Sequence, residues 1–146
     1  MATRAQNFEN HTRFFPLFHF IAAPLLAINL VFALSALGRA PSLATAAGVV
    51  LAAGVIATLL AARTMVLSVQ NRVIRLEMTM RIERLLGAAA AADALASLTV
   101  GTLVALRFAS DAELPALIAR VRSNELATAR EVKRAIREWQ PDYLRA

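Results

Sequence analysis

The chain has 146 residues, of which 58% are hydrophobic, with a mean hydropathy of +0.56 and a net charge of +6. It has no cysteine, which excludes disulfides and thiolate metal sites. Charge and hydrophobicity lie in different parts of the chain, because 13 of the 16 basic residues and 9 of the 10 acidic ones lie from Arg63 onward. The composition therefore predicts a membrane-embedded front part followed by a mildly cationic tail.

Residues 1–15 are predicted to form an N-terminal interfacial arm. They are polar at first and show no helical periodicity, so we expect them to lie on the membrane surface or on another part of the protein. Aromatic and histidine side chains then gather, as is typical of the depth at which rings meet lipid head groups. The residues of this interfacial segment are His11, Arg13, Phe14, Phe15, Phe18 and His19.

Two uncharged stretches follow, and each exceeds the roughly 20 apolar residues that a helix needs to cross a bilayer. They predict a first transmembrane helix at 16–37, an external turn at 38–42 and a second helix at 43–86. Pro24 lies inside the first helix and predicts a kink. The first stretch is a poor match to a cleaved signal because it follows a polar arm and continues with aromatic bulk.

The basic residues beside the two spans predict the orientation of the chain. Arg39 alone occupies the turn, whereas Arg4 and Arg13 precede the first span and five arginines follow the second span within residues 63–84. Positive charge near span ends favours the cytoplasmic side of a membrane. Both termini are therefore expected in the cytoplasm.

Small residues recur every four positions along the second span and predict close helix packing, because small side chains let backbones approach each other. One ridge is available for the first span and another for a second copy or a different protein, and a merely alanine-rich composition is the alternative. Asn29 is expected to hydrogen-bond from the first span to the second. The predicted packing residues are Asn29, Ala44, Gly48, Ala52, Gly54 and Thr58.

The second helix is expected to continue beyond the membrane as a rod that ends at Leu86, because no glycine or proline interrupts residues 65–86. A pair four residues apart, Glu77 and Arg81, supports this helix. The rod carries two apolar stripes about 140° apart, by wheel arithmetic at 100° per residue. One stripe is Val66, Val69, Val73, Leu76 and Met80, and the other is Leu67, Ile74, Met78, Ile82 and Leu85. Two stripes need two neighbours: the protein's own tail and either a partner or a second copy.

Residues 87–146 are predicted to form a small helical tail. Ser110 with Glu113 and Thr128 with Glu131 have the spacing of capping boxes, and each would open a short helix. The last helix is expected to carry Val132, Ile136 and Trp139 on one face. A basic surface near that helix is predicted to face anionic lipid or solvent rather than nucleic acid. Its residues are Arg130, Lys133, Arg134 and Arg137.

The reactive groups do not form a recognisable catalytic pattern, so no enzyme activity, metal or cofactor is expected. The carboxylates fit helix caps and ion pairs with arginine. His19 has three interpretations: an interfacial side chain bonded to a carbonyl or a head group, a ligand to haem or a chlorophyll-type pigment, or a contact with a partner.

Both ends of the chain resemble a family of small uncharacterised bacterial two-span membrane proteins. The resemblance rests on QNFENHTRFFPLFHF at 6–20, LRFASDAELPALIARV at 106–121 and KRAIREWQPDYLRA at 133–146. It implies a two-span hairpin with a helical cytoplasmic tail, and it implies no activity. It also draws attention to Asn10, His11 and Trp139, and we expect the arm and the C-terminal segment to meet at the cytoplasmic membrane face.

These observations predict an all-α membrane protein: a two-helix transmembrane hairpin with an extended second helix and a small helical C-terminal module. The expected function is that of a non-catalytic accessory or scaffold subunit of a larger inner-membrane complex, respiratory or photosynthetic, in a bacterium. Its partners would be the lipid bilayer and other membrane subunits. The alternatives are a self-associating protein that pairs through the Val66–Met80 stripe and a pigment binder that uses His19.

Overall fold

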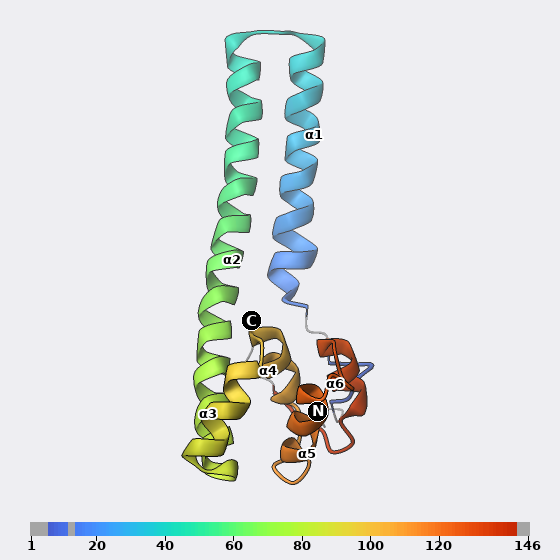
Figure 1. Ribbon diagram of the computed structural model, residues 1–146. Coiled ribbons are helices and arrows are strands. Elements are labelled where there is room, and N and C mark those ends of the chain that lie inside the picture. Colours follow the sequence, from blue (N-terminus) through green and yellow to red (C-terminus); the bar gives the residue numbers. More distant parts are fainter. Residues whose placement is uncertain (1–5, 12–13, 143–146) are drawn as a thin grey trace. The chain divides into compact units, whose positions relative to one another are not determined.

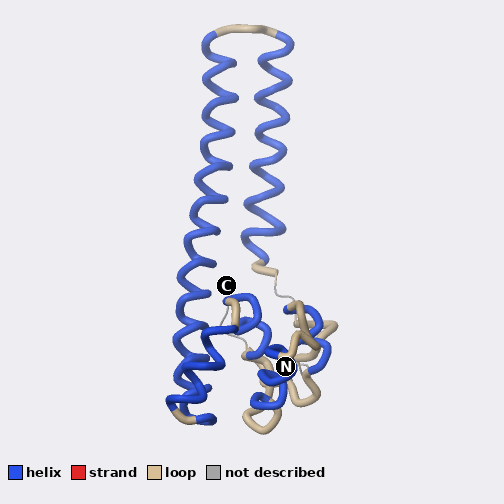
Figure 2. Tube along the Cα trace, viewed as in Figure 1, coloured by secondary structure: helices blue, strands red, loops and turns tan. Residues whose placement is uncertain are grey.

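The computed structural model describes residues 6–11 and 14–142, and this part of the chain is helical apart from its loops and one isolated β-bridge (Figure 2). The chain divides into two compact units. We call residues 14–67 the apolar-helix unit, and residues 6–11 together with 68–142 the tail unit. The elements are η1 (Leu17–Ala22), α1 (Ala23–Arg39), α2 (Leu43–Leu86), α3 (Ala88–Ser97), α4 (Val100–Leu106), α5 (Leu114–Arg122) and α6 (Ala129–Ala135) (Figure 1).

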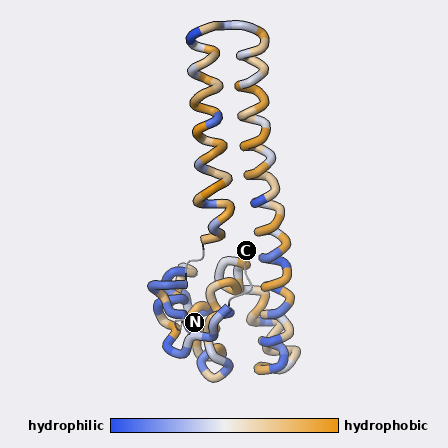
Figure 3. The backbone as a smooth tube through the Cα atoms, turned by 180° about the vertical axis from the view of Figure 1, so that it is seen from behind, coloured by the Kyte–Doolittle hydropathy of each residue, from blue (hydrophilic) through white to orange (hydrophobic). Residues whose placement is uncertain are grey.

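Two helices are long and apolar enough to cross a membrane: η1 with α1, at Leu17–Arg39, and α2. Their large side chains point outward, and Phe32 and Leu51 each leave 70% of their surface exposed. Figure 3 shows this apolar character along both helices of the unit. Water would penalise so much exposed apolar surface, whereas lipid would not.

Pro24 changes the helix that leads up to it. Proline has no N–H to bond the carbonyl four residues earlier, so α-helical hydrogen bonding cannot continue unbroken through this point. Instead Leu17–Ala22 forms a π-helix, and the amide of Ala23 bonds to the carbonyl of Phe18 five residues earlier. The disturbance predicted at Pro24 thus takes the form of a widened helical turn before the proline.

The chain reverses between α1 and α2 through residues 40–42. Ser42 and Thr45 cap the start of α2 reciprocally, since the Thr45 amide donates to Ser42 Oγ at 3.1 Å and the Ser42 amide donates to Thr45 Oγ1 at 2.9 Å. Within the apolar-helix unit, α1 and the first half of α2 run side by side (Figures 1 and 2).

The buried face of α2 in this unit differs from the predicted small-residue ridges. Ala52 is buried, and Val49, Ile56 and Leu59 beside it are half-buried. The other predicted packing residues of α2 are exposed: Ala44, Gly48, Gly54 and Thr58. Asn29 is also exposed, and its side chain has no hydrogen-bond partner among residues 6–11 and 14–142, so the predicted bond to α2 is absent. The buried face thus combines Ala52, one of the predicted small residues, with medium-sized side chains at spacings of three and four.

The tail unit has one hydrophobic core, to which α2 contributes Ile74, Met78 and Ile82. Among the side chains from the rest of the tail unit, Phe108, Leu106 and Leu114 are fully buried there. Together α3 and α4 are long and apolar enough to form a span, but the chain bends by 119° between them. Two buried alanines of α3, Ala91 and Ala94, belong to this core, as do Leu103, Ala105 and Leu106 of α4.

The turn between α2 and α3 depends on Gly87, whose φ of +80° and ψ of 158° lie in a region that is nearly restricted to glycine. The helix therefore breaks sharply at this position, directly after the predicted end at Leu86. Thr99 then caps α4, and the predicted Thr128–Glu131 capping box is confirmed at the start of α6.

The last predicted helix is shorter than expected. α6 ends at Ala135, and Ile136 is extended, so Trp139 does not continue the helical face. Tertiary bonds explain the difference: the Gln140 amide donates to the Phe108 carbonyl at 2.7 Å, and Trp139 forms the isolated bridge with Ala109. The segment after α6 therefore pairs with the segment after α4.

Replacing Gly87 with alanine should destabilise the tail unit by about 1–3 kcal/mol, because a Cβ makes this backbone conformation costly. Gly101→Ala is the matched control: Gly101 lies inside α4, and an added Cβ would meet only Thr99 Oγ1 at 3.8 Å. That change should be neutral or stabilising by about 0.5–1 kcal/mol. Thermal unfolding followed by circular dichroism in detergent distinguishes the two variants, and equal stability of both would contradict the assignment of Gly87.

Candidate functional site

The described residues contain no group of three or more His, Cys, Asp or Glu side chains that could hold a metal ion. Their carboxylates mainly serve structure. The Glu113 carboxylate accepts the amides of Ser110, Arg137 and Glu138 at 3.1–3.3 Å. The candidate site is therefore built from exposed surfaces and from contacts between distant segments.

An apolar stripe on α2 stays uncovered, and we call it the seam. Its residues are Val66, Val69, Val73, Leu76 and Met80, and each leaves about half or more of its surface exposed. The second stripe is covered, since Ile74, Met78 and Ile82 are buried and Leu85 packs against the same core. The protein's own tail thus covers the second stripe and leaves the seam free for another neighbour.

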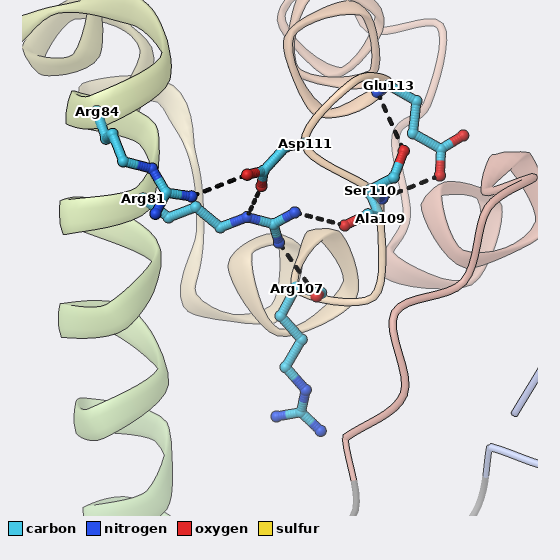
Figure 4. Close-up of polar contacts among 7 residues, drawn as sticks. All are labelled: Arg81, Arg84, Arg107, Ala109, Ser110, Asp111 and Glu113. Atoms are coloured by element: carbon cyan, nitrogen blue, oxygen red, sulfur yellow. Dashed lines mark hydrogen bonds and ion pairs between the residues drawn. The ribbon is translucent and has the colours of Figure 1, made fainter.

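Arg81 joins α2 to the segment after α4 (Figure 4). Its Nε lies 2.6 Å from the Asp111 carboxylate, and its two terminal nitrogens donate to the carbonyls of Ala109 and Arg107 at 2.7 and 3.3 Å. Arg84 adds a second contact to Asp111 at 2.8 Å. Arg81 therefore does not form the predicted pair with Glu77, because the tail offers it an acid and two carbonyls in fixed positions.

The hydrogen bond from Arg81 lowers the pKa of Asp111, with added attraction from Arg81 and Arg84, although desolvation acts in the opposite direction. A carboxylate with a lowered pKa stabilises the fold above its ordinary range, and this contribution is lost as the pH falls through the lowered value.

The arm contacts the C-terminal segment, as the sequence predicts. Asn7 and Asn10 hold it in a compact turn, in which the Asn7 amide donates to Asn10 Oδ1 at 2.7 Å and the Asn10 amide donates back to Asn7 Oδ1 at 3.1 Å. Farther along the tail, Gln6 Oε1 accepts the amide of Asp142 at 2.9 Å.

His11 lies at the centre of this contact. Its Nδ1 is 2.6 Å from the Phe8 carbonyl, which can only accept, so Nδ1 carries the proton. Its Nε2 is then left to accept from the Lys133 ammonium at 3.2 Å. The imidazole ring also contacts the rings of Phe108 and Trp139, with centroids 6.2 and 5.8 Å away.

The predicted basic surface is divided by these contacts. Lys133 is half-buried against His11 and the Phe108 ring, and Arg134 lies over the Phe8 ring at 5.2 Å. Arg130 and Arg137 are exposed. Two of the four basic residues therefore hold the arm, a role that their shared helical position could not indicate.

The predicted interfacial segment is divided between the units: His11 belongs to the tail unit, whereas Phe14, Phe15, Phe18 and His19 belong to the apolar-helix unit. His19 Nδ1 lies 3.0 Å from both the amide and the carbonyl of Phe15, and the His19 ring contacts Phe14 and Phe18. This agrees with the interpretation of His19 as locally bonded. Arg13 lies outside the described residues.

A groove of about 380 Å³ lies within the apolar-helix unit, between the start of η1 and α2. Its lining is almost entirely apolar, and Arg63 is the one charged residue in it. The Arg63 guanidinium lies 5.2 Å from the centre of the Phe18 ring. The lining residues are Phe15, Leu17, Phe18, Ala22, Leu59, Ala62, Arg63 and Val66.

Arg107 is a structural residue that the sequence pattern did not reveal. Its side chain is only 9% exposed, its Nε lies 3.2 Å from Asp142, and its guanidinium lies 4.6 Å from the centre of the Phe108 ring. The sequence feature that could have indicated this role is an arginine within the apolar run 103–108, because a buried charge needs a partner.

Replacing Arg81 with methionine should destabilise the tail unit by about 1–2 kcal/mol, because the change removes two carbonyl bonds and an ion pair. Hydrogen exchange of residues 107–113 should increase several-fold. Arg75→Met is the control, since Arg75 is exposed on the same helix and forms no ion pair within the described part of the chain. Asp111→Asn should weaken the contact less and remove the part of the loss of stability on acidification that comes from the lowered pKa of Asp111. Unchanged exchange in Arg81→Met would contradict this role.

Replacing His11 with alanine should detach the arm from the tail. Trp139 is the only tryptophan of the chain, so its fluorescence reports the contact directly. We expect a red-shifted emission and greater quenching by acrylamide, because the indole gains solvent where the imidazole was. Glu9→Ala is the control, as Glu9 is exposed in the same arm. Identical spectra for both variants would show that the arm does not cover Trp139.

Comparison with known proteins places the chain in a family. The description of that family reads "family of unknown function (DUF6526)", and its pattern matches residues 1–146. The chain therefore belongs to this family, over its whole length. No curated protein and no solved structure matches the chain.

Proposed function

We propose that this member of a family of unknown function is a non-catalytic accessory or scaffold subunit of a bacterial inner-membrane complex. The two long apolar helices would form a transmembrane hairpin, with both termini in the cytoplasm. The tail unit would then stand at the cytoplasmic surface, where its exposed basic residues can face anionic lipid or acidic protein. A respiratory or photosynthetic complex is the expected setting.

The observation that supports this proposal best is the uncovered seam. Val69 and Leu76 each leave 61% of their surface exposed, although an adjacent face of the same helix is buried by the tail. Three charged residues lie on α2 between the seam residues Val69 and Met80, and they are costly to place in hydrocarbon. They are Arg72, Arg75 and Glu77. An apolar stripe in such a setting favours a protein partner over lipid.

The contacts of the carboxylates support a role without catalysis. Asp111 is held by two arginines, Glu113 accepts three amides, and Glu131 completes a helix cap. Each of these carboxylates has a structural partner, and we assign none of them to a reaction with a substrate. Binding is therefore the activity that we assign to the protein.

The proposal is tested by purifying the chain from its native membranes in a mild detergent. Other subunits should co-purify in a fixed ratio with the wild-type protein, and native mass spectrometry identifies them. Val73→Gln combined with Leu76→Gln should reduce their recovery about tenfold or more, because two buried apolar anchors of an interface typically contribute more than 1 kcal/mol each.

Arg75→Gln serves as the matched control, since Arg75 lies on α2 between the two changed positions and points away from the seam on the helical wheel. It should leave recovery unchanged. Equal recovery from wild type and the seam variant would contradict the proposal, provided that Trp139 fluorescence shows an intact tail in both.

A further inference from the structure

The spacing of the seam is that of a coiled coil. Its residues follow one another at intervals of three, four, three and four along a single uninterrupted helix. Such spacing defines the a and d positions of a heptad, which face a partner helix. The a positions are Val66, Val73 and Met80, and the d positions are Val69 and Leu76. In a parallel coil, valine at a with leucine at d, as at Val73 and Leu76, favours two strands.

The charges beside the seam complement one another in such a pair. Arg72 takes the g position and Glu77 the e position of the following heptad. In a parallel pair, g of one helix lies beside the following e of its partner, so Arg72 of each copy would meet Glu77 of the other. Both residues are exposed, and neither forms an ion pair within the described part of the chain. The two charges are thus available on either side of the apolar stripe.

The direction and register of the pair follow from the position of the seam on α2. The same helix contains an apolar segment long enough to cross a membrane. Two copies inserted with the same orientation therefore present their seams parallel and at the same depth. A two-fold axis along the membrane normal then repeats every contact twice, as in most soluble dimers. Confinement to a bilayer also raises the effective concentration of copies, which helps a seam of only about two heptads.

We propose that the occupant of the seam is a second copy of this chain, which forms a parallel two-stranded coil held in register by two Arg72–Glu77 pairs between copies. The inference rests on the proposed binding function of the seam and names its partner. Other subunits of a complex would bind to the resulting dimer, so a change that breaks the pair at the seam also reduces their recovery.

Disulfide cross-linking tests the geometry, because the natural chain has no cysteine and one introduced thiol is unambiguous. In a parallel two-fold pair, a d position faces its own counterpart. Full-length Leu76→Cys, reconstituted in phosphatidylcholine vesicles at a low protein-to-lipid ratio, should form a covalent dimer under mild oxidation. Arg75→Cys is the control, since it lies on the opposite side of the helix and should cross-link at least several-fold less.

Charge exchange tests the register. Added to Leu76→Cys, Arg72→Glu should reduce cross-linking about fivefold to tenfold, because two attractions become two repulsions. Arg72→Glu together with Glu77→Arg should restore it. Trp139 fluorescence verifies that the tail stays folded in each variant. Equal cross-linking by Leu76→Cys and Arg75→Cys, or no recovery in the exchanged variant, would overturn the proposal.

The two proposals fail in different ways. Suppose that another subunit co-purifies with wild type from native membranes and not with the seam variant, while Leu76→Cys gives no covalent dimer. The self-pairing is then wrong and the accessory role stands. If Leu76→Cys cross-links and the exchanged variant recovers, but no other subunit co-purifies with wild type, the self-pairing stands and the role in a larger complex is wrong.

Discussion

Helix α2 has two apolar faces beyond its spanning segment, and the tail of the same chain can cover only one of them. This constraint arises because no glycine or proline interrupts residues 65–86, so the helix presents both faces along its whole length. Ile74, Met78 and Ile82 enter the tail core, whereas the seam stays exposed. The tail unit thus has a buried core on one side of α2 and an exposed apolar stripe on another.

Polar contacts determine which face the tail takes. Arg81 lies about 100° from the centre of the seam on the helical wheel and reaches Asp111 and two backbone carbonyls. A purely apolar contact could slide or rotate by one residue, but a guanidinium with three acceptors fixes the rotation of the helix. The specificity of this contact therefore comes from one arginine, while burial of the apolar stripe supplies the driving force.

The long elements and their apolar faces could be predicted from the sequence, because composition and helical periodicity are local properties. The two stripes of α2, its end at Leu86 and the Thr128–Glu131 cap belong to this class. Contacts that depend on distant partners could not be predicted in this way. Arg81 pairs with Asp111 rather than Glu77, Trp139 leaves the helix to pair with Ala109, and Lys133 contacts His11. The small-residue pattern was only in part a guide to packing. Ala52 is buried, whereas a Cβ added at Gly48 or Gly54 would meet nothing within 4 Å beyond its own helix.

The contact between the arm and the tail has a consequence for biosynthesis. Gln6 and His11 precede Asp142 and Trp139 in the chain, and a chain is synthesised from its N-terminal side. The arm therefore has no docking surface until Trp139 and Asp142 have been made. A product that stops short of Trp139 leaves the arm uncovered, so such a truncated copy differs from a longer one at a segment that was made much earlier.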